Sequence, residues 1–183
     1  MDIEMPGANQ PLVRARLLAF FLPAALLAGA LGFQYFGRLH PCELCLQQRI
    51  PHYAAVVAAT LAIILRRHPV SFLLTTLAGL LVVTSGFQAV YHLGVEFHWW
   101  ERPEPCGLTF EPGGGNLLAK IIAAPLVSCD KPQWTLFGIS LAGWNALFSL
   151  VGGCLILVLC WRARLIGSYC PRTSEMGRER TGS

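Results

Sequence analysis

Two cysteines and an arginine form the motif in this chain with the clearest chemical potential. The segment reads Pro41-Cys42-Glu43-Leu44-Cys45, and Arg49 follows four residues after the second cysteine. A C-x-x-C pair can be redox-active, bind a metal ion or form a structural crosslink. If a helix begins at the motif, Cys42, Cys45 and Arg49 share one face of it. A thiol at a helix N-terminus beside a guanidinium is favoured as the reactive thiolate.

Five further cysteines lie in three regions of the chain. Cys106 and Cys129 lie in one long polar connection and could form a second redox pair or a structural disulfide. Cys154 and Cys160 lie in the last apolar segment, where we expect them to act as small packing residues. Cys170 follows that segment, and we expect it to remain a reduced thiol.

The chain that must position these cysteines has the composition of a membrane protein. Of its 183 residues, 54% are hydrophobic and only 13% are charged, whereas a soluble domain carries about a quarter charged residues. Four apolar segments can each cross about 30 Å of hydrocarbon as a helix; they cover about residues 15–36, 46–65, 70–93 and 136–161. We therefore predict an all-α, four-helix transmembrane bundle, with residues 1–183 as a single domain.

The basic residues set the expected orientation of this bundle. Nine Lys and Arg residues belong to one end of the four segments and five to the other. The positive-inside rule places the tails 1–14 and 162–183 in the cytoplasm and the loops 37–45 and 94–135 outside. Both cysteine pairs then face the compartment in which disulfides persist. Because the basic residues flank apolar segments, nucleic-acid binding is not expected.

Two local patterns refine this topology. The long second outer loop contains Leu117, Leu118, Ile121 and Ile122 on one helical face, which predicts a short helix on the membrane surface. Trp99, Trp100 and Trp134 flank the loop as an aromatic belt. Near the N-terminus, Ala28-Gly29-Ala30 resembles a signal-peptide cleavage site. The apolar run continues to Phe36, however, and this favours an uncleaved helix.

The assembled features resemble the DsbB family of bacterial disulfide-bond formation membrane proteins. The resemblance includes the C-x-x-C motif with Arg49, the four spans, the two cysteines of the second outer loop, and Gln133-Trp134 after Cys129. It covers the chain from about Arg14 to Trp161. The pattern C-x-x-C-x-x-x-R at the start of the second of four spans is a specific combination.

This resemblance implies a protein-disulfide:quinone oxidoreductase of the bacterial inner membrane that supports protein folding in the periplasm. Cys106–Cys129 would be the disulfide offered to a DsbA-like partner with a thioredoxin fold, whose thiolate attacks Cys106. Cys129 would then attack Cys42, and Cys45 would leave as a thiolate facing ubiquinone or menaquinone. Such a chain of thiols and quinone keeps the bacterial periplasm oxidising.

The resemblance also implies a quinone site without a metal ion. Arg49 is one candidate to bind the quinone, because an arginine at that depth is costly unless it is paired or contacts a ligand. A histidine near the outer end of the third span is the other, and His92 is our candidate among its neighbours Tyr91, Glu96 and His98. Gln47 and Gln48 could bind a quinone carbonyl or satisfy the helix N-terminus.

Three other functions are compatible with parts of the pattern. A vitamin K epoxide reductase-like enzyme also combines C-x-x-C with a quinone, but its motif usually lies in a later span. A metal site built from the four outer cysteines is weakly supported by a single C-x-x-C. A non-enzymatic four-span adhesion or scaffold protein would use its outer disulfides as staples and would not need Arg49 below Cys45.

Overall fold

The computed structural model describes residues 10–101, 103 and 128–169. In this part of the chain, four helices and one short hairpin follow one another: α1 (Gln10–Tyr35), α2 (Glu43–Ile64), α3 (Val70–Glu96), β1 (Thr135–Leu136), β2 (Ile139–Ser140) and α5 (Leu141–Tyr169). The surface helix expected in the second outer loop, together with Cys106 and Cys170, lies outside the described residues.

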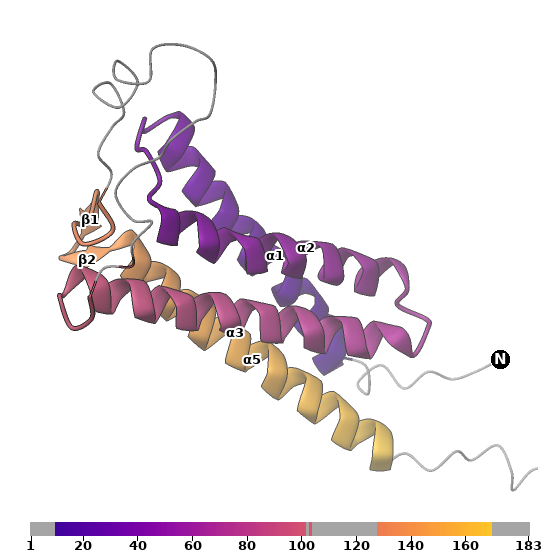
Figure 1. The fold of residues 1–183 in the computed structure, drawn as a ribbon. Coiled ribbons are helices and arrows are strands. Elements are labelled where there is room, and N and C mark those ends of the chain that lie inside the picture. The colour runs from indigo at the N-terminus through magenta and orange to yellow at the C-terminus, as the bar shows by residue number, and fades with distance from the viewer. Residues whose placement is uncertain (1–9, 102, 104–127, 170–183) are drawn as a thin grey trace, which may run out of the picture.

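The helices run up and down, so that alternate connections meet at the same end of the bundle. The α1–α2 connection lies at the end that carries the hairpin, and the α2–α3 turn lies at the other end (Figure 1). At that second end, Arg16 donates a hydrogen bond of 3.3 Å to the backbone oxygen of Arg66. Two of the basic groups that we expected on one side of the membrane therefore lie together.

Small side chains fill the centre of the bundle. α3 packs against α2 and α5, and α1 packs against the same two helices. Alanines at these contacts let the helix backbones approach closely, which is how helices associate where lipid weakens the hydrophobic driving force. The buried central cluster consists of Ala15, Ala19, Ala55, Ala58, Ala59, Ala78, Val82, Ile156 and Cys160. Cys160 is thus a packing residue as predicted, whereas Cys154 lies exposed on the outer face of α5.

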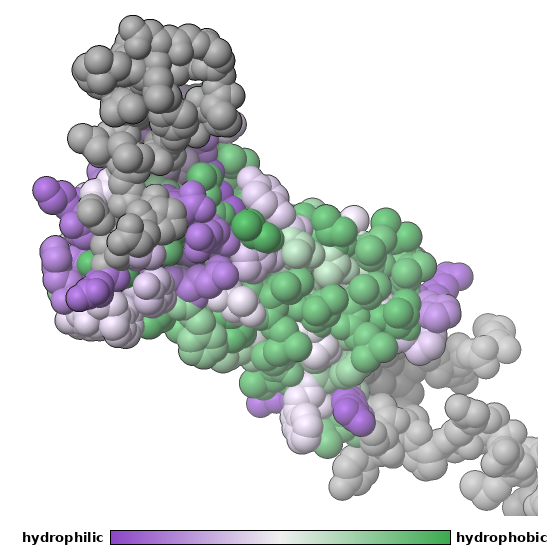
Figure 2. All heavy atoms as spheres, in the orientation of Figure 1, coloured by the Kyte–Doolittle hydropathy of each residue, from purple (hydrophilic) through white to green (hydrophobic). Residues whose placement is uncertain are grey.

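Large apolar side chains cover the outside of the bundle. On the face shown in Figure 2, a broad hydrophobic surface covers the helices, and hydrophilic residues gather at the end that carries the hairpin. Among the described helices, α1, α3 and Leu141–Ile166 of α5 are long and apolar enough to cross a membrane. α2 does not reach this hydropathy, because polar residues occupy its first half: Gln47, Gln48, Arg49 and His52.

The start of the last helix differs from the prediction. Residues 136–140, which we expected inside the span 136–161, belong to a hairpin in which Thr135 pairs with Ser140. Phe137 and Gly138 both have positive φ values, of 53° and 77°, as a tight two-residue turn requires. The hydroxyl of Ser140 then accepts a hydrogen bond of 3.1 Å from the backbone N–H of Gly143. This N-cap explains why α5 begins at Leu141.

The contact between α3 and α5 depends on glycine. A Cβ atom at Gly153 would lie 3.1 Å from the backbone nitrogen of Val83 and 3.3 Å from the backbone oxygen of Gly79. We therefore expect Gly153→Ala to force the two helices apart and to destabilise the protein by about 1–3 kcal/mol, the usual cost of overpacking. Thermal unfolding of the detergent-solubilised protein measures this loss.

Gly32→Ala in α1 is the matched control, because a Cβ atom there meets nothing within 4 Å. We expect that variant to unfold at or above the temperature of the unaltered protein, since alanine favours helix over glycine. Equal unfolding temperatures for Gly153→Ala and Gly32→Ala would contradict close packing of α3 on α5.

Candidate functional site

Cys42 and Cys45 lie at the N-terminus of α2. Cys42 is the N-cap residue in an extended conformation, and its Sγ accepts a hydrogen bond of 3.3 Å from the backbone N–H of Cys45. The two sulfur atoms are 3.0 Å apart, and both cysteines are free thiols in this structure. The helix therefore begins at the motif, and the local spacing of the C-x-x-C pair brings the sulfurs into direct contact.

The pKa values of the two thiols are shifted in opposite directions. Cys42 donates its hydrogen to the sulfur of Cys45, and this bond lowers the pKa of Cys45 despite burial, with a further contribution from the positive charge of Arg49. The same bond, together with burial, raises the pKa of Cys42. Both cysteines precede the apolar segment of α2 that begins at Leu46. Cys45 is consequently the better leaving group of the pair.

Arg49 is held by α1 one turn below Cys45. Its Nη1 donates a hydrogen bond of 2.5 Å to Oε1 of Gln34, and its Nη2 donates one of 3.4 Å to the backbone oxygen of Ala30. The guanidinium therefore links α2 to α1 rather than extending toward lipid headgroups. These bonds leave it on the wall of the cavity described below, together with Cys45.

His92 comes from α3 and lies between the cysteine pair and the interior of the bundle. Its ring is 3% exposed, with Nε2 3.6 Å from Sγ of Cys42 and Nδ1 2.8 Å from Nε2 of Gln48. Glu96 lies one turn further on, with Oε1 3.9 Å from Nε2 of His92. Among the histidines of this region that we considered, His92 is thus the one that contacts the C-x-x-C motif.

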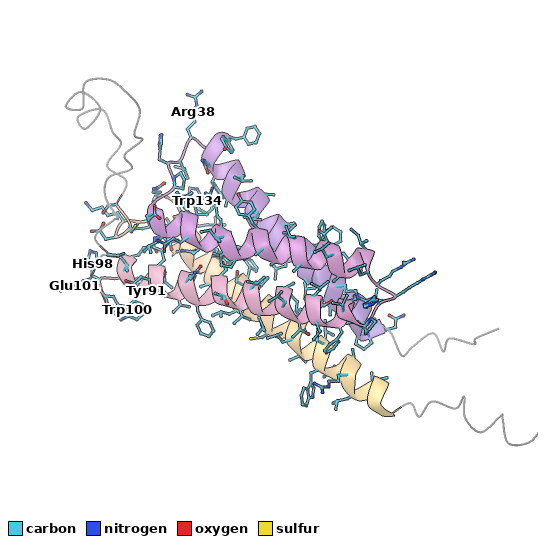
Figure 3. The ribbon with its side chains drawn as sticks, turned by 45° about the vertical axis from the view of Figure 1, so that its right-hand side comes forward. Arg38, Tyr91, His98, Trp100, Glu101 and Trp134 are labelled. Atoms are coloured by element: carbon cyan, nitrogen blue, oxygen red, sulfur yellow. The ribbon has the colours of Figure 1, made fainter. Side chains whose placement is uncertain are left out.

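The other aromatic side chains near the end of α3 lie away from the motif. Tyr91 stacks on Trp100 with ring centroids 5.5 Å apart, and Figure 3 shows Tyr91, His98 and Trp100 at the outer end of α3. Gln47 is exposed and donates a hydrogen bond of 3.4 Å to Glu43 of its own helix, whereas Gln48 is buried against His92. Only one of the two glutamines therefore belongs to the site.

Cys129, which lies near the end of the long second loop, is buried beside the C-x-x-C motif. It is 1% exposed and packs in one buried cluster with Cys42, Leu44 and Val95. Its backbone also forms a hydrogen bond with the ring of His92. Cys129 is disulfide-bonded, whereas Cys42, Cys45, Cys154 and Cys160 are free thiols. The structure thus brings together Cys42, Cys45, Arg49, His92 and Cys129, and Cys106 is not described.

A cavity of about 420 Å³ opens beside these residues. Apolar and aromatic side chains form most of its wall, and a few polar groups converge on it, as in most small-molecule sites. Two of the aromatic rings, Phe33 and Trp134, pack against each other with centroids 4.7 Å apart. The polar groups on the wall include Cys45, Gln48, Arg49, His52, His92 and Asn145.

Sequence reasoning missed the polar side chains that complete this wall. Gln34 holds Arg49, and Asn145 donates a hydrogen bond of 2.8 Å to Oε1 of Gln48. Both residues interrupt segments that are otherwise apolar, and a polar residue within a membrane segment is itself a signal of function. Their partners, however, come from other helices, so the sequence alone does not indicate what they bind.

Three atoms of the site could hold a metal ion. The sulfur atoms of Cys42 and Cys45 and a ring nitrogen of His92 lie within 4.8 Å of one another. Such a set of thiolate and imidazole ligands suits Zn²⁺. An ion there would occupy the same sulfur atoms that a disulfide requires, so metal binding and disulfide chemistry exclude each other at this pair.

Comparisons with known proteins agree with the resemblance seen in the sequence. The family model described as "Disulfide bond formation protein DsbB" matches residues 13–159. A disulfide bond formation protein B from Polaromonas sp. (strain JS666) is 37% identical over 143 residues, which cover 72% of this chain and 83% of that protein. The protein of that name from Methylococcus capsulatus is 35% identical over 161 residues, or 80% and 93% of the two chains.

A relative of lower identity shows a similar coverage. The disulfide bond formation protein B of Haemophilus influenzae (strain KW20) is 31% identical over 151 residues, which cover 78% of this chain and 82% of that protein. No solved structure is a significant match. Together with the three long apolar helices, these matches show that the chain belongs to the DsbB family of membrane disulfide bond formation proteins.

Proposed function

We propose that this protein is a thiol:quinone oxidoreductase that reoxidises a DsbA-like dithiol protein in the bacterial periplasm. The observation that carries the proposal is the contact between the sulfurs of Cys42 and Cys45, 3.0 Å apart at the edge of the cavity. A pair at this distance can close into a disulfide with little movement. Family membership supports the disulfide chemistry, and the cavity supports a lipid-soluble electron acceptor.

In the proposed exchange, each step forms one sulfur–sulfur bond and breaks another. A thiolate of the partner attacks Cys106, and Cys129 leaves with the electron pair of the Cys106–Cys129 bond. Cys129 then attacks Cys42, and the electron pair of the Cys42–Cys45 bond leaves on Cys45. The burial of Cys129 beside Cys42 supports the second attack, and the lowered pKa of Cys45 favours its departure.

The residues of the cavity fit a quinone, either ubiquinone or menaquinone. Bound there, a quinone would accept two electrons and two protons. Arg49 is the side chain that we expect to hold a quinone oxygen, because it lines the cavity close to Cys45. His92, the other candidate, lines the same wall and would lie against the quinone, with its ring nitrogens directed at Gln48 and at Cys42 and Cys129. The apolar wall from α1 and α5 would exclude water from Cys45 and leave its thiolate poorly solvated.

The same proposal includes four membrane spans, with α2 as the least apolar of them. Its polar first half faces the cavity rather than lipid, since Gln48 and His52 are only 5% and 3% exposed. The second half carries exposed Val57, Leu61 and Ile64. With the basic ends of the helices in the cytoplasm, the hairpin and the C-x-x-C motif face the periplasm.

The four outer cysteines give the first test of this function. We expect purified protein to oxidise a reduced thioredoxin-fold partner only when quinone is added. Replacing Cys42, Cys45, Cys106 or Cys129 singly by Ser should abolish turnover, because each sulfur takes part in a bond exchange. The rate of quinone reduction, followed by its ultraviolet absorbance, measures the effect.

Cys154→Ser is the matched control, since Cys154 is a free thiol exposed on the far part of α5. It should retain full activity. Full activity in all four outer-cysteine variants would exclude the proposed thiol relay.

Arg49 gives the second test. We expect Arg49→Ala to raise the apparent KM for quinone about tenfold or more, the loss that follows removal of one hydrogen bond from a charged donor. The KM for the thioredoxin-fold partner should stay nearly unchanged, because Arg49 lines the cavity, where Gln34 of α1 holds it, and takes no part in the exchange between sulfur atoms. Steady-state kinetics with each substrate varied in turn separates the two constants.

Arg67→Ala removes the same charge at the opposite end of the bundle, where Arg67 is exposed. Its kinetic constants should match those of the unaltered protein. An unchanged quinone KM in Arg49→Ala would remove Arg49 from the quinone site.

A further inference from the structure

A connected group of polar side chains lies inside the bundle behind the C-x-x-C motif. Asn145 of α5 donates a hydrogen bond of 2.8 Å to Oε1 of Gln48, and Nε2 of Gln48 lies 2.8 Å from Nδ1 of His92. On its other side, Oδ1 of Asn145 lies 3.0 Å from Nε2 of His52. Side chains from three helices therefore form one continuous chain of hydrogen bonds from His52 to His92.

The direction of these bonds follows from groups that can play only one role. An amide nitrogen only donates, so Nδ1 of His92 must accept from Gln48. Gln48 then offers its amide oxygen to Asn145, and Asn145 offers its own oxygen to His52. Nε2 of His52 must carry a hydrogen, and its Nδ1 is left bare; that atom is buried without a hydrogen-bond partner.

The same reasoning determines whether the second ring nitrogen of His92 carries a hydrogen. A neutral imidazole whose Nδ1 accepts must carry its hydrogen on Nε2. This nitrogen lies 3.6 Å from Sγ of Cys42, and it is the ring atom left to bond the backbone of Cys129. In the opposite tautomer, a lone pair of Nε2 would face the carbonyl lone pairs of Cys129 and the electron-rich sulfur of Cys42.

We propose that His52, Asn145 and Gln48 are positioning residues that hold His92 in the Nε2–H tautomer, with that hydrogen directed at Cys42 and Cys129. The inference rests on the proposed exchange between these two cysteines. When Cys129 attacks Cys42, the Cys42–Cys129 bond forms, the Cys42–Cys45 bond breaks, and its electron pair leaves on Cys45. His92 in this tautomer holds the attacking residue by its backbone and donates toward the sulfur under attack.

Two serine hydroxyls also bond to this series of hydrogen bonds, but they do not determine which groups in it donate and which accept. Ser85 donates to the backbone oxygen of Gln48 at 2.9 Å, and its Oγ lies 2.9 Å from Nε2 of His52. Ser149 donates to Oδ1 of Asn145 at 2.9 Å. Each hydroxyl can rotate to suit its neighbours, whereas the amide of Asn145 connects one histidine to the other through fixed donor and acceptor ends.

The tautomer of His92 can be measured directly by ¹⁵N nuclear magnetic resonance on protein with labelled histidine. The signals are assigned with His92→Gln, which removes the resonances in question. We expect the unaltered protein to show a protonated Nε2 and an unprotonated, hydrogen-bonded Nδ1. Asn145→Leu should add a population with protonated Nδ1, because Gln48 is then free to turn its amide oxygen toward His92.

Ser149→Ala is the matched control, since it also removes a partner of Asn145 but leaves the direction of the chain unchanged. It should keep the single tautomer. A protonated Nδ1 in the unaltered protein would overturn the proposal, as would identical His92 spectra for Asn145→Leu and the unaltered protein. Because this measurement needs neither partner nor quinone, it stands even if the proposed enzymatic function fails.

Turnover tests the consequence for the exchange. At saturating quinone, we expect Asn145→Leu to oxidise the thioredoxin-fold partner about tenfold more slowly, the rate equivalent of one hydrogen bond, and Ser149→Ala to be unaffected. If Asn145→Leu changes the tautomer but not the rate, His92 does not assist the exchange and that part of the proposal is wrong.

Discussion

The hydrogen bond between the thiols of Cys42 and Cys45 is the interaction on which the site depends. It exists because Cys42 caps α2 in an extended conformation while Cys45 lies in the first helical turn. One sulfur then donates and the other accepts, so two chemically identical residues differ in acidity.

Placing this pair at the end of a membrane bundle requires polar side chains between the helices, where membrane proteins usually have apolar ones. Around the cavity, the bundle meets this requirement by giving the polar side chains partners from other helices. Arg49 binds α1 through Gln34 and Ala30, and His92 is joined to α2 and α5 through Gln48 and Asn145. These bonds fix the relative positions of the helices around the cavity, whereas the alanine-rich centre only lets them approach.

The parts of this arrangement that could be predicted from sequence are those encoded over short distances. The start of α2 at the C-x-x-C motif and the shared face of Cys45 and Arg49 follow from helical spacing. The apolar helices follow from length and composition, although α5 begins at Leu141 rather than 136 because Phe137-Gly138 forms a turn and Ser140 caps the helix. That turn signal lies in the sequence, but it is hidden within an apolar stretch.

The remaining features depend on contacts between residues far apart in the chain. Nothing near Gln48 indicates that its amide lies between Asn145 and His92, which are 97 and 44 positions away. The burial of Cys129 beside Cys42 is likewise a tertiary contact across the longest loop of the chain. The roles of the individual site residues, and the domain limits 1–183, stay predictions.

The acidity of Cys45 tests the central claim most directly. In the reduced protein, the alkylation of Cys45 can be followed against pH by mass spectrometry of the peptide that contains it. Because the thiolate reacts, a lowered pKa predicts a midpoint below the ordinary cysteine value of about 8.5, and Cys42→Ala should raise it by removing the donated hydrogen bond. A midpoint at or above the ordinary value, unchanged by Cys42→Ala, would contradict the account.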